Sequence, residues 1–127
     1  MTETMRQCDV LLVEDDLQLG EVMGTYLARN GLGVRTAHSG SSALRILETA
    51  QPKVAVLDFQ LPDMNGVELS QKIIRALPGI QIIMMSGAIG SLEQEMLEKI
   101  GIRVFVNKPV PLRTLLRAIV QLMQEHP

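Results

Sequence analysis

The stretch that decides the fold runs Val54-Ala55-Val56-Leu57-Asp58-Phe59, four apolar residues followed by a carboxylate and an aromatic ring. Uniformly apolar, β-branched runs of this length are typical of parallel strands that are covered on both faces. Similar runs occur at 10–13, 82–85 and 104–106, and a weaker run, in which apolar and polar residues alternate, spans 33–37. The sequence therefore predicts five strands, with the weakest at an edge of the sheet.

Segments with helical periodicity separate these runs and are bounded by capping or helix-breaking residues. We expect helices over 19–27, over 41–50, from Asn65 to Pro78, from Ser91 to Gly101, and over 112–123 with Pro111 near the start. Strand and helix thus alternate five times, which implies right-handed crossovers and a parallel sheet with helices on both faces. The predicted fold class is a doubly wound α/β fold of five βα units.

The composition favours one compact domain with an aliphatic core. The chain has 127 residues, 46% of them hydrophobic but only 2% aromatic, and a net charge of −2. This length is enough for one domain and not for two, and it needs no disulfide or metal to fold. The near-balanced charge argues against direct nucleic-acid binding through a basic face.

The sequence also indicates the cellular compartment in which the protein works. Cys8 is the single cysteine, so no intrachain disulfide can form, as expected in a reducing environment. Residues 1–7 are polar and contain no apolar core of signal-peptide length, and no apolar run approaches the length of a membrane span. We expect a soluble, cytoplasmic protein without membrane contact.

Chemically active side chains follow the predicted strands. In sheets of this class, ligands bind outside the carboxyl ends of the strands. Glu14-Asp15-Asp16 follows the first strand, Asp58 closes the third, Ser86-Gly87-Ala88 follows the fourth, and Lys108-Pro109 follows the fifth. We therefore expect these groups on one rim of the sheet.

Taken singly, most of these residues have an ordinary structural explanation. Asp15 or Asp16 could cap the first helix, Ser86 could be a loop hydroxyl, and Lys108 could be a solvated surface lysine. Asp58 is different, because it directly follows an apolar run and should be partly desolvated. A buried carboxylate without a partner costs several kcal/mol or shifts its pKa upward, so something must compensate it.

The joint arrangement points to phosphoryl chemistry. Several carboxylates on one rim repel each other unless a cation joins them, and oxygen-only ligands suit a hard divalent ion such as Mg²⁺. Lys108 adds a positive point charge and Ser86 adds a hydroxyl donor. A metal, a lysine and a hydroxyl around Asp58 could hold a phosphoryl group, with the carboxylate itself as the nucleophile.

With these motifs in order, the chain resembles the receiver domain of two-component response regulators. The resemblance rests on Leu12 to Asp16, Leu57 to Gly66, Met85 to Ala88 and Val106 to Pro109, and it extends from about Asp9 to the last helix. It implies the flavodoxin-like strand order 2-1-3-4-5. It also implies that residues 1–127 form a single receiver domain, with a core over about 8–125 and no output domain.

The resemblance implies a role for each acidic position. Asp58 would be the phosphoacceptor of a protein that catalyses its own phosphorylation and dephosphorylation without being a turnover enzyme. Glu14, Asp15 and Asp58, with the backbone carbonyl of Gln60, would hold Mg²⁺ or Mn²⁺, Asp15 directly and Glu14 through water. Asp16 would only cap the first helix.

The resemblance also implies a conformational switch that responds to the phosphoryl group. Ser86 would contact the phosphoryl group, Gly87 would open access to it, and Lys108 would pair with it. Phe105 would be the switch aromatic that follows Ser86 toward the phosphoryl group. The Lys108-Pro109 peptide bond would be cis.

The implied partners are a sensor histidine kinase or histidine phosphotransfer protein, and a downstream protein or an output domain outside this chain. The surface of the fourth helix, fifth strand and fifth helix would signal the change, and could form a homodimer through opposite charges. That surface would carry Glu93, Glu95, Glu98, Arg103, Arg113 and Arg117. A solvated helix face explains the same charges.

Three other functions fit the fold class less well. A phosphatase with an aspartyl nucleophile needs a second aspartate where this chain has Gln60. A flavin binder needs a phosphate loop where Glu14-Asp15-Asp16 would repel the phosphate. A receiver-like interaction module without phosphorylation remains the main alternative, although every key side chain is present.

Overall fold

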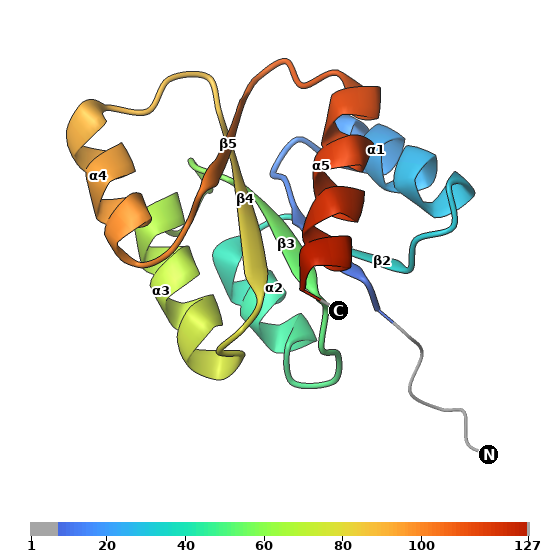
Figure 1. Ribbon diagram of the computed structural model, residues 1–127, viewed down its shortest axis with the longest axis horizontal. Coiled ribbons are helices and arrows are strands. Elements are labelled where there is room, and N and C mark those ends of the chain that lie inside the picture. Colours follow the sequence, from blue (N-terminus) through green and yellow to red (C-terminus); the bar gives the residue numbers. More distant parts are fainter. Residues whose placement is uncertain (1–7, 127) are drawn as a thin grey trace.

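The computed structural model describes residues 8–126, and these form a parallel sheet between two layers of helices (Figure 1). The strands are β1 (Val10–Val13), β2 (Val34–Ala37), β3 (Val54–Asp58), β4 (Gln81–Ser86) and β5 (Val104–Asn107). Their order is β2-β1-β3-β4-β5, and all neighbours are parallel. The predicted fold class, the implied strand order and the edge position of the weakest strand are confirmed. Residues 1–7, where the sequence shows no signal-peptide core, lie outside the described residues.

Five helices cover the two faces of this sheet. Helices α1 (Leu17–Arg29) and α5 (Leu112–Glu125) lie on one side, and α2 (Gly40–Ile46), α3 (Gly66–Ala76) and α4 (Ser91–Lys99) lie on the other (Figure 1). Within the described residues, none of these helices combines the length and apolar character that crossing a bilayer requires.

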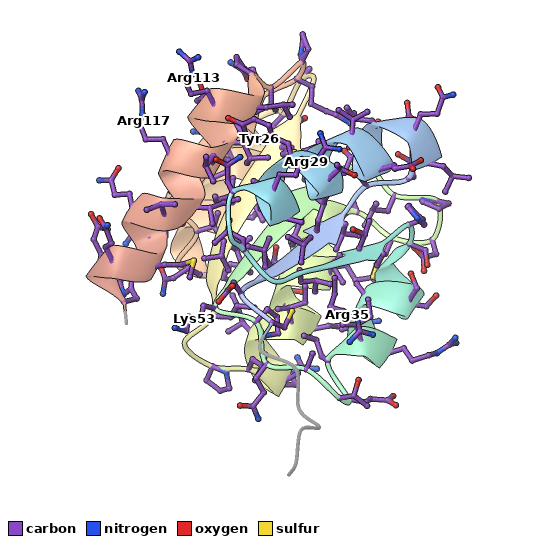
Figure 2. All side chains as sticks on the ribbon, turned by 90° about the vertical axis from the view of Figure 1, so that its right-hand side faces the viewer. Tyr26, Arg29, Arg35, Lys53, Arg113 and Arg117 are labelled. Carbon is purple, nitrogen blue, oxygen red and sulfur yellow. The ribbon has the colours of Figure 1, made fainter. Side chains whose placement is uncertain are left out.

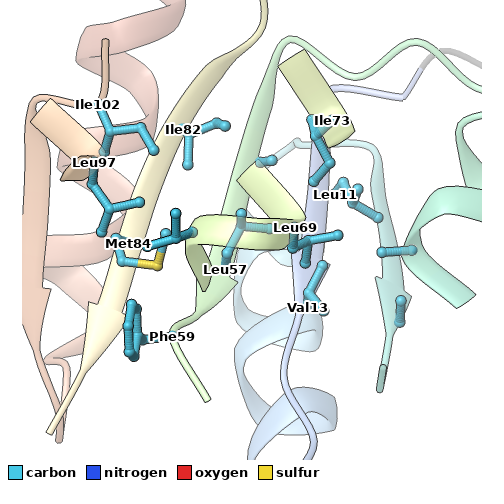
Figure 3. Packing of buried hydrophobic residues seen from close by; sticks show 14 residues of the cluster. Leu11, Val13, Leu57, Phe59, Leu69, Ile73, Ile82, Met84, Leu97 and Ile102 are labelled. Carbon is cyan, nitrogen blue, oxygen red and sulfur yellow. The ribbon is translucent and has the colours of Figure 1, made fainter. Parts of the chain in front are cut away.

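The apolar strands supply both faces of the core because successive side chains of a strand point to opposite sides. Leu11 and Leu57 point toward α2, α3 and α4, where they pack with Leu69 and Ile73 of α3 (Figure 3). Their neighbours on the same strands point the other way, toward α1 and α5. That second cluster includes Val10, Leu12, Val54, Val56, Met23, Leu115 and Ile119.

Local capping signals explain several helix boundaries. The carboxylate of Asp16 accepts the backbone N–H of Leu19 at 3.0 Å and caps α1, as one of the ordinary explanations predicted. The side chain of Asn65 accepts the N–H of Glu68 at 3.0 Å at the start of α3. Gly66, the first residue of α3, sits so close to its neighbours that an added Cβ would lie 2.8 Å from the Phe59 ring.

Helix α2 differs from its prediction. It spans Gly40–Ile46 rather than 41–50, because its carboxyl end tightens. The N–H groups of Glu48 and Thr49 donate to carbonyls three residues earlier, not four. These turns bring the chain to the buried Pro52 and so end the helix early.

The expected start of the fourth helix at Ser91 is confirmed, since Ser91 is the first residue of α4 and Gly90 takes the cap position without a side-chain hydrogen bond. The expectation for the last helix differs from the structure in one detail. The spacing of the apolar residues in 112–123 predicts that Val120 shares one apolar stripe with Leu115 and Ile119, but Val120 is 36% exposed, whereas Leu115 and Ile119 are buried. The stripe that contacts the sheet is therefore narrower than the sequence pattern.

Candidate functional site

The strand register brings the predicted site residues to one rim. Val13 pairs with Leu57, so Glu14 and Asp58 follow at the same level on neighbouring strands. Ser86 pairs with Asn107 at the ends of the next two strands, so Lys108 follows directly. Four of the five strands thus deliver a polar group to the same edge, as predicted from the sequence.

These groups surround a depression of about 590 Å³. Its lining consists of Asp15, Asp58, Gln60, Leu61, Pro62, Ser86, Gly87, Ala88 and Lys108. Three predicted site residues, Glu14, Phe105 and Pro109, lie outside the lining. Glu14 is fully buried behind it, and Phe105 is half-buried against the core cluster on the side of α2, α3 and α4. The Lys108-Pro109 peptide bond is cis.

Lys108 is the cationic centre of the site. Its Nζ lies 3.0 Å from Oδ2 of Asp58 and 2.9 Å from Oε1 of Glu14. The side chains of Glu14 and Asp58 are 0% and 8% exposed, and that of Lys108 is 25% exposed. The sequence did not predict the contact with Glu14, because Glu14 and Lys108 follow β1 and β5, which are not neighbours in the sheet, and no local signal marks how far the Lys108 side chain reaches.

The pKa values reflect this arrangement. Burial raises the pKa of Glu14, and the nearby charge of Asp58 adds to this, while Lys108 and the backbone N–H of Asp16 oppose it. Burial by itself lowers the pKa of Lys108, but its contacts with Glu14 and Asp58 outweigh burial and raise that pKa. Lys108 therefore stays charged throughout the physiological range.

The acidic residues could hold a hard cation. Carboxylate oxygens of Glu14, Asp15 and Asp58 lie within 4.8 Å of one another. Oε1 of Glu14 is buried and has no well-aligned hydrogen-bond donor among the described residues, although Lys108 is close to it. An oxygen-only cluster with an incompletely satisfied buried oxygen suits Mg²⁺ or Mn²⁺. Asp16 is excluded from this cluster because its side chain caps α1.

The other side of the depression offers a hydroxyl and open space. The Oγ of Ser86 accepts the N–H of Ala88 at 3.0 Å, which leaves its hydroxyl proton free to donate elsewhere. An added Cβ at Gly87 would meet nothing within 4 Å. A small anionic group could therefore approach Asp58 from this side.

A histidine supports the acidic side of the site. Nδ1 of His38 lies 2.8 Å from the backbone carbonyl oxygen of Glu14, so His38 helps to hold the backbone where the acidic residues begin. His38 follows the edge strand without metal-ligand spacing, so the sequence pattern indicates no site role for it. No sequence signal could have found this contact.

Comparisons with known proteins agree with this geometry. A family model described as response regulator receiver domain matches residues 10–120. The transcriptional regulatory protein GlrR of Escherichia coli K12 is 32% identical over 111 residues, which cover 87% of this chain and 25% of that protein. The DNA-binding response regulator MtrA of Mycolicibacterium smegmatis is 31% identical over 107 residues, covering 84% of this chain and 46% of that protein.

A solved structure supports the same assignment. The CheY-like response regulator receiver domain protein from Methanospirillum hungatei superposes with a TM-score of 0.90 at 28% identity, covering 95% of this chain and 97% of that one. By contrast, the chain spans less than half the length of the two curated relatives named above. The chain belongs to the response regulator receiver domain family, the signalling modules of two-component systems.

Proposed function

We propose that Asp58 accepts a phosphoryl group from a partner histidine kinase or histidine phosphotransfer protein. The observation that carries the proposal is the contact of Asp58 with Lys108 inside the acidic depression. Asp58 lies at the end of β3, nearly buried, with one carboxylate oxygen near the ammonium group. The other, Oδ1, accepts the N–H of Gln60 at 3.2 Å.

The proposed step is a phosphoryl transfer between two nucleophiles. A carboxylate oxygen of Asp58 forms a bond to phosphorus while the bond from phosphorus to the donor's histidine nitrogen breaks. The electron pair of that bond returns to the imidazole, and the product is an acyl phosphate. Lys108 and the hydroxyl of Ser86 would each meet an oxygen of the transferred group, where negative charge accumulates.

The acidic residues would hold the divalent cation. Glu14, Asp15, Asp58 and the backbone carbonyl of Gln60 are the proposed ligands of Mg²⁺ or Mn²⁺. When bound, the cation neutralises negative charge on the carboxylates and the phosphoryl oxygens. The oxygen-only cluster supports this assignment.

The proposed output is a population shift on the surface of α4, β5 and α5. Ser86 would move toward the phosphoryl group and Phe105, half-buried on β5, would follow. This surface exposes Leu92 and Met96 of α4, and Arg113 and Arg117 project from α5 away from the sheet (Figure 2). A downstream protein, an output domain on a longer chain or a second copy would recognise it. We place this activity in the cytoplasm, a reducing compartment that the free Cys8 fits.

Phosphorylation by acetyl phosphate tests the proposal without the unknown kinase. We expect intact-mass spectrometry to detect one added phosphoryl group on the wild-type chain with Mg²⁺, and none with a chelator. Asp58→Asn should remove the modification, whereas Asp16→Asn, in the acidic run but outside the cluster, should retain it. Equal phosphorylation of the wild type and Asp58→Asn would overturn the assignment.

A further inference from the structure

Asp63 contacts the start of helix α2, which lies more than 20 residues earlier in the chain. Asp63 lies at the tip of the turn that follows Asp58, outside the lining of the depression. Its Oδ1 accepts the backbone N–H of Gly40 at 2.8 Å, and its Oδ2 accepts that of Ser41 at 2.9 Å. These two residues begin α2, where N–H groups lack partners within the helix and favour a carboxylate.

Helix α2 already has a local cap, so these contacts do more than cap it. The side chain of Ser39 accepts the N–H of Ser42 at 3.2 Å, and the N–H of Ser39 donates to the hydroxyl of Ser42. The contacts of Asp63 therefore add a link between α2 and a distant turn. Met64 strengthens the link, because an added Cβ at Gly40 would lie 2.5 Å from its sulfur.

The turn that carries Asp63 is closed at its base. Gln60 and Asn65 form an antiparallel bridge, and the N–H of Gly66 donates to the carbonyl of Phe59 at 2.6 Å. Between them, the N–H of Leu61 donates to the carbonyl of Met64 at 3.2 Å. The segment is thus one compact unit, and the position of its tip affects the position of its base.

The base of this turn belongs to the proposed metal site. Gln60 lines the depression, and its N–H donates to Oδ1 of Asp58. Surface turns move unless they are attached to a rigid element, and a metal ligand depends on the groups that orient it. The tip of this turn is attached to α2 through Asp63 and Met64.

We propose that Asp63 is a positioning residue for the divalent cation site: by attaching the turn to the first residues of α2, it fixes Gln60 and the Asp58 carboxylate that Gln60 contacts. This inference rests on the proposed function, since it concerns the same cation. It adds a residue that touches neither the cation nor the phosphoryl group.

Magnesium titration of the full chain, followed by amide NMR, tests the role of Asp63. We expect Asp63→Ala to weaken Mg²⁺ binding about 10-fold, as is common when a group that orients a ligand is lost. Asp63→Asn keeps one oxygen acceptor and should lie between Asp63→Ala and the wild type. Ser39→Ala is the matched control, because it removes a cap from the same helix without touching the turn. It should keep wild-type Mg²⁺ affinity.

Hydrogen exchange without metal gives a second, independent measurement. The amide of Gln60 should exchange faster in Asp63→Ala than in Ser39→Ala, because only the first change releases the turn. The inference is overturned if Asp63→Ala binds Mg²⁺ as the wild type does, or if both variants lose affinity by the same factor. A wild-type chain that binds no Mg²⁺ would instead refute the proposed cation site, and this inference with it.

Discussion

Replacing Lys108 by methionine tests how much the positive charge at the centre of the site contributes to stability. Lys108→Met keeps most of the aliphatic stem but removes the ammonium group near Glu14 and Asp58. At these distances, 2.9 and 3.0 Å, each contact supplies roughly 5.5 kcal/mol of direct attraction at an effective dielectric constant of about 20. The cost of removing the charges from water offsets most of this attraction. Losing one partner of a buried pair costs about 3–5 kcal/mol, and the partial exposure of Lys108 favours the lower value, about 3 kcal/mol.

The loss of stability in Lys108→Met should depend on pH, because Glu14 can take up a proton. The pKa of Glu14 is higher in the folded protein than in the unfolded chain. The free energy of unfolding therefore falls as the pH rises from the pKa of the unfolded state through that of the folded state. Without Lys108 this pKa rises further, and a proton on Glu14 relieves the unpaired charge. Lys108 titrates only in the alkaline range, where its raised pKa lies, so its own protonation does not change at acidic pH. The deficit of Lys108→Met should therefore be smaller at about pH 5 than at about pH 7.

Urea unfolding followed by far-ultraviolet circular dichroism measures both effects. Glu14→Gln combined with Lys108→Met is the control, because it removes one of the two buried carboxylate charges that the single change leaves without their cation. The double variant should be more stable than Lys108→Met alone at about pH 7. The reasoning is refuted if Lys108→Met is as stable as the wild type, or if its loss of stability is the same at both pH values. It is also refuted if the double variant is no more stable than Lys108→Met.

Three further predictions concern other parts of the chain. Gly66→Ala should lower the free energy of unfolding by about 1–3 kcal/mol, measured in urea, because its Cβ would press on Phe59. Leu115→Ala should cost about 2–5 kcal/mol and Val120→Ala less than about 0.5 kcal/mol in the same assay, since only the first side chain is buried. The two N–H groups at the start of α2 lower the pKa of Asp63, so its stabilising effect is present above the unfolded pKa and is lost as pH falls through the folded one. A carbon-detected NMR titration of Asp63 should show this lowered midpoint, and an ordinary midpoint would contradict it.

The sequence predicts the sheet well because the strands are marked locally. The runs at 54–57 and 82–85 are apolar at every position, and both faces of the sheet are covered. The run at 33–37 includes polar residues because the edge strand β2 is covered less completely than the central strands, so that Val34 and Thr36 are half-buried and Arg35 is exposed. Helix ends are less predictable, because the early end of α2 depends on hydrogen bonds that tighten its last turn.

For the site, too, the sequence predicts the positions of the residues better than the contacts between them. Asp58, Ser86 and Lys108 could be placed on one rim from the sequence, because parallel strands end on the same edge of a sheet. Their exact contacts could not be assigned, since the order of the strands does not say how far each side chain reaches. The ion pair between Glu14 and Lys108 and the contact of Asp63 with α2 both join segments that only the folded chain brings together.

The charges of the site argue that one cationic side chain is not enough for the proposed reaction. Three carboxylates and one ammonium group leave about two unbalanced negative charges around the depression. A phosphoryl donor brings further negative charge to the same place, and Lys108 already lies between Glu14 and Asp58. A divalent cation matches the unbalanced charge, whereas a monovalent ion does not. Phosphorylation of Asp58 should therefore depend on a divalent cation even when Lys108 is intact, and a high concentration of Na⁺ or K⁺ should not replace it.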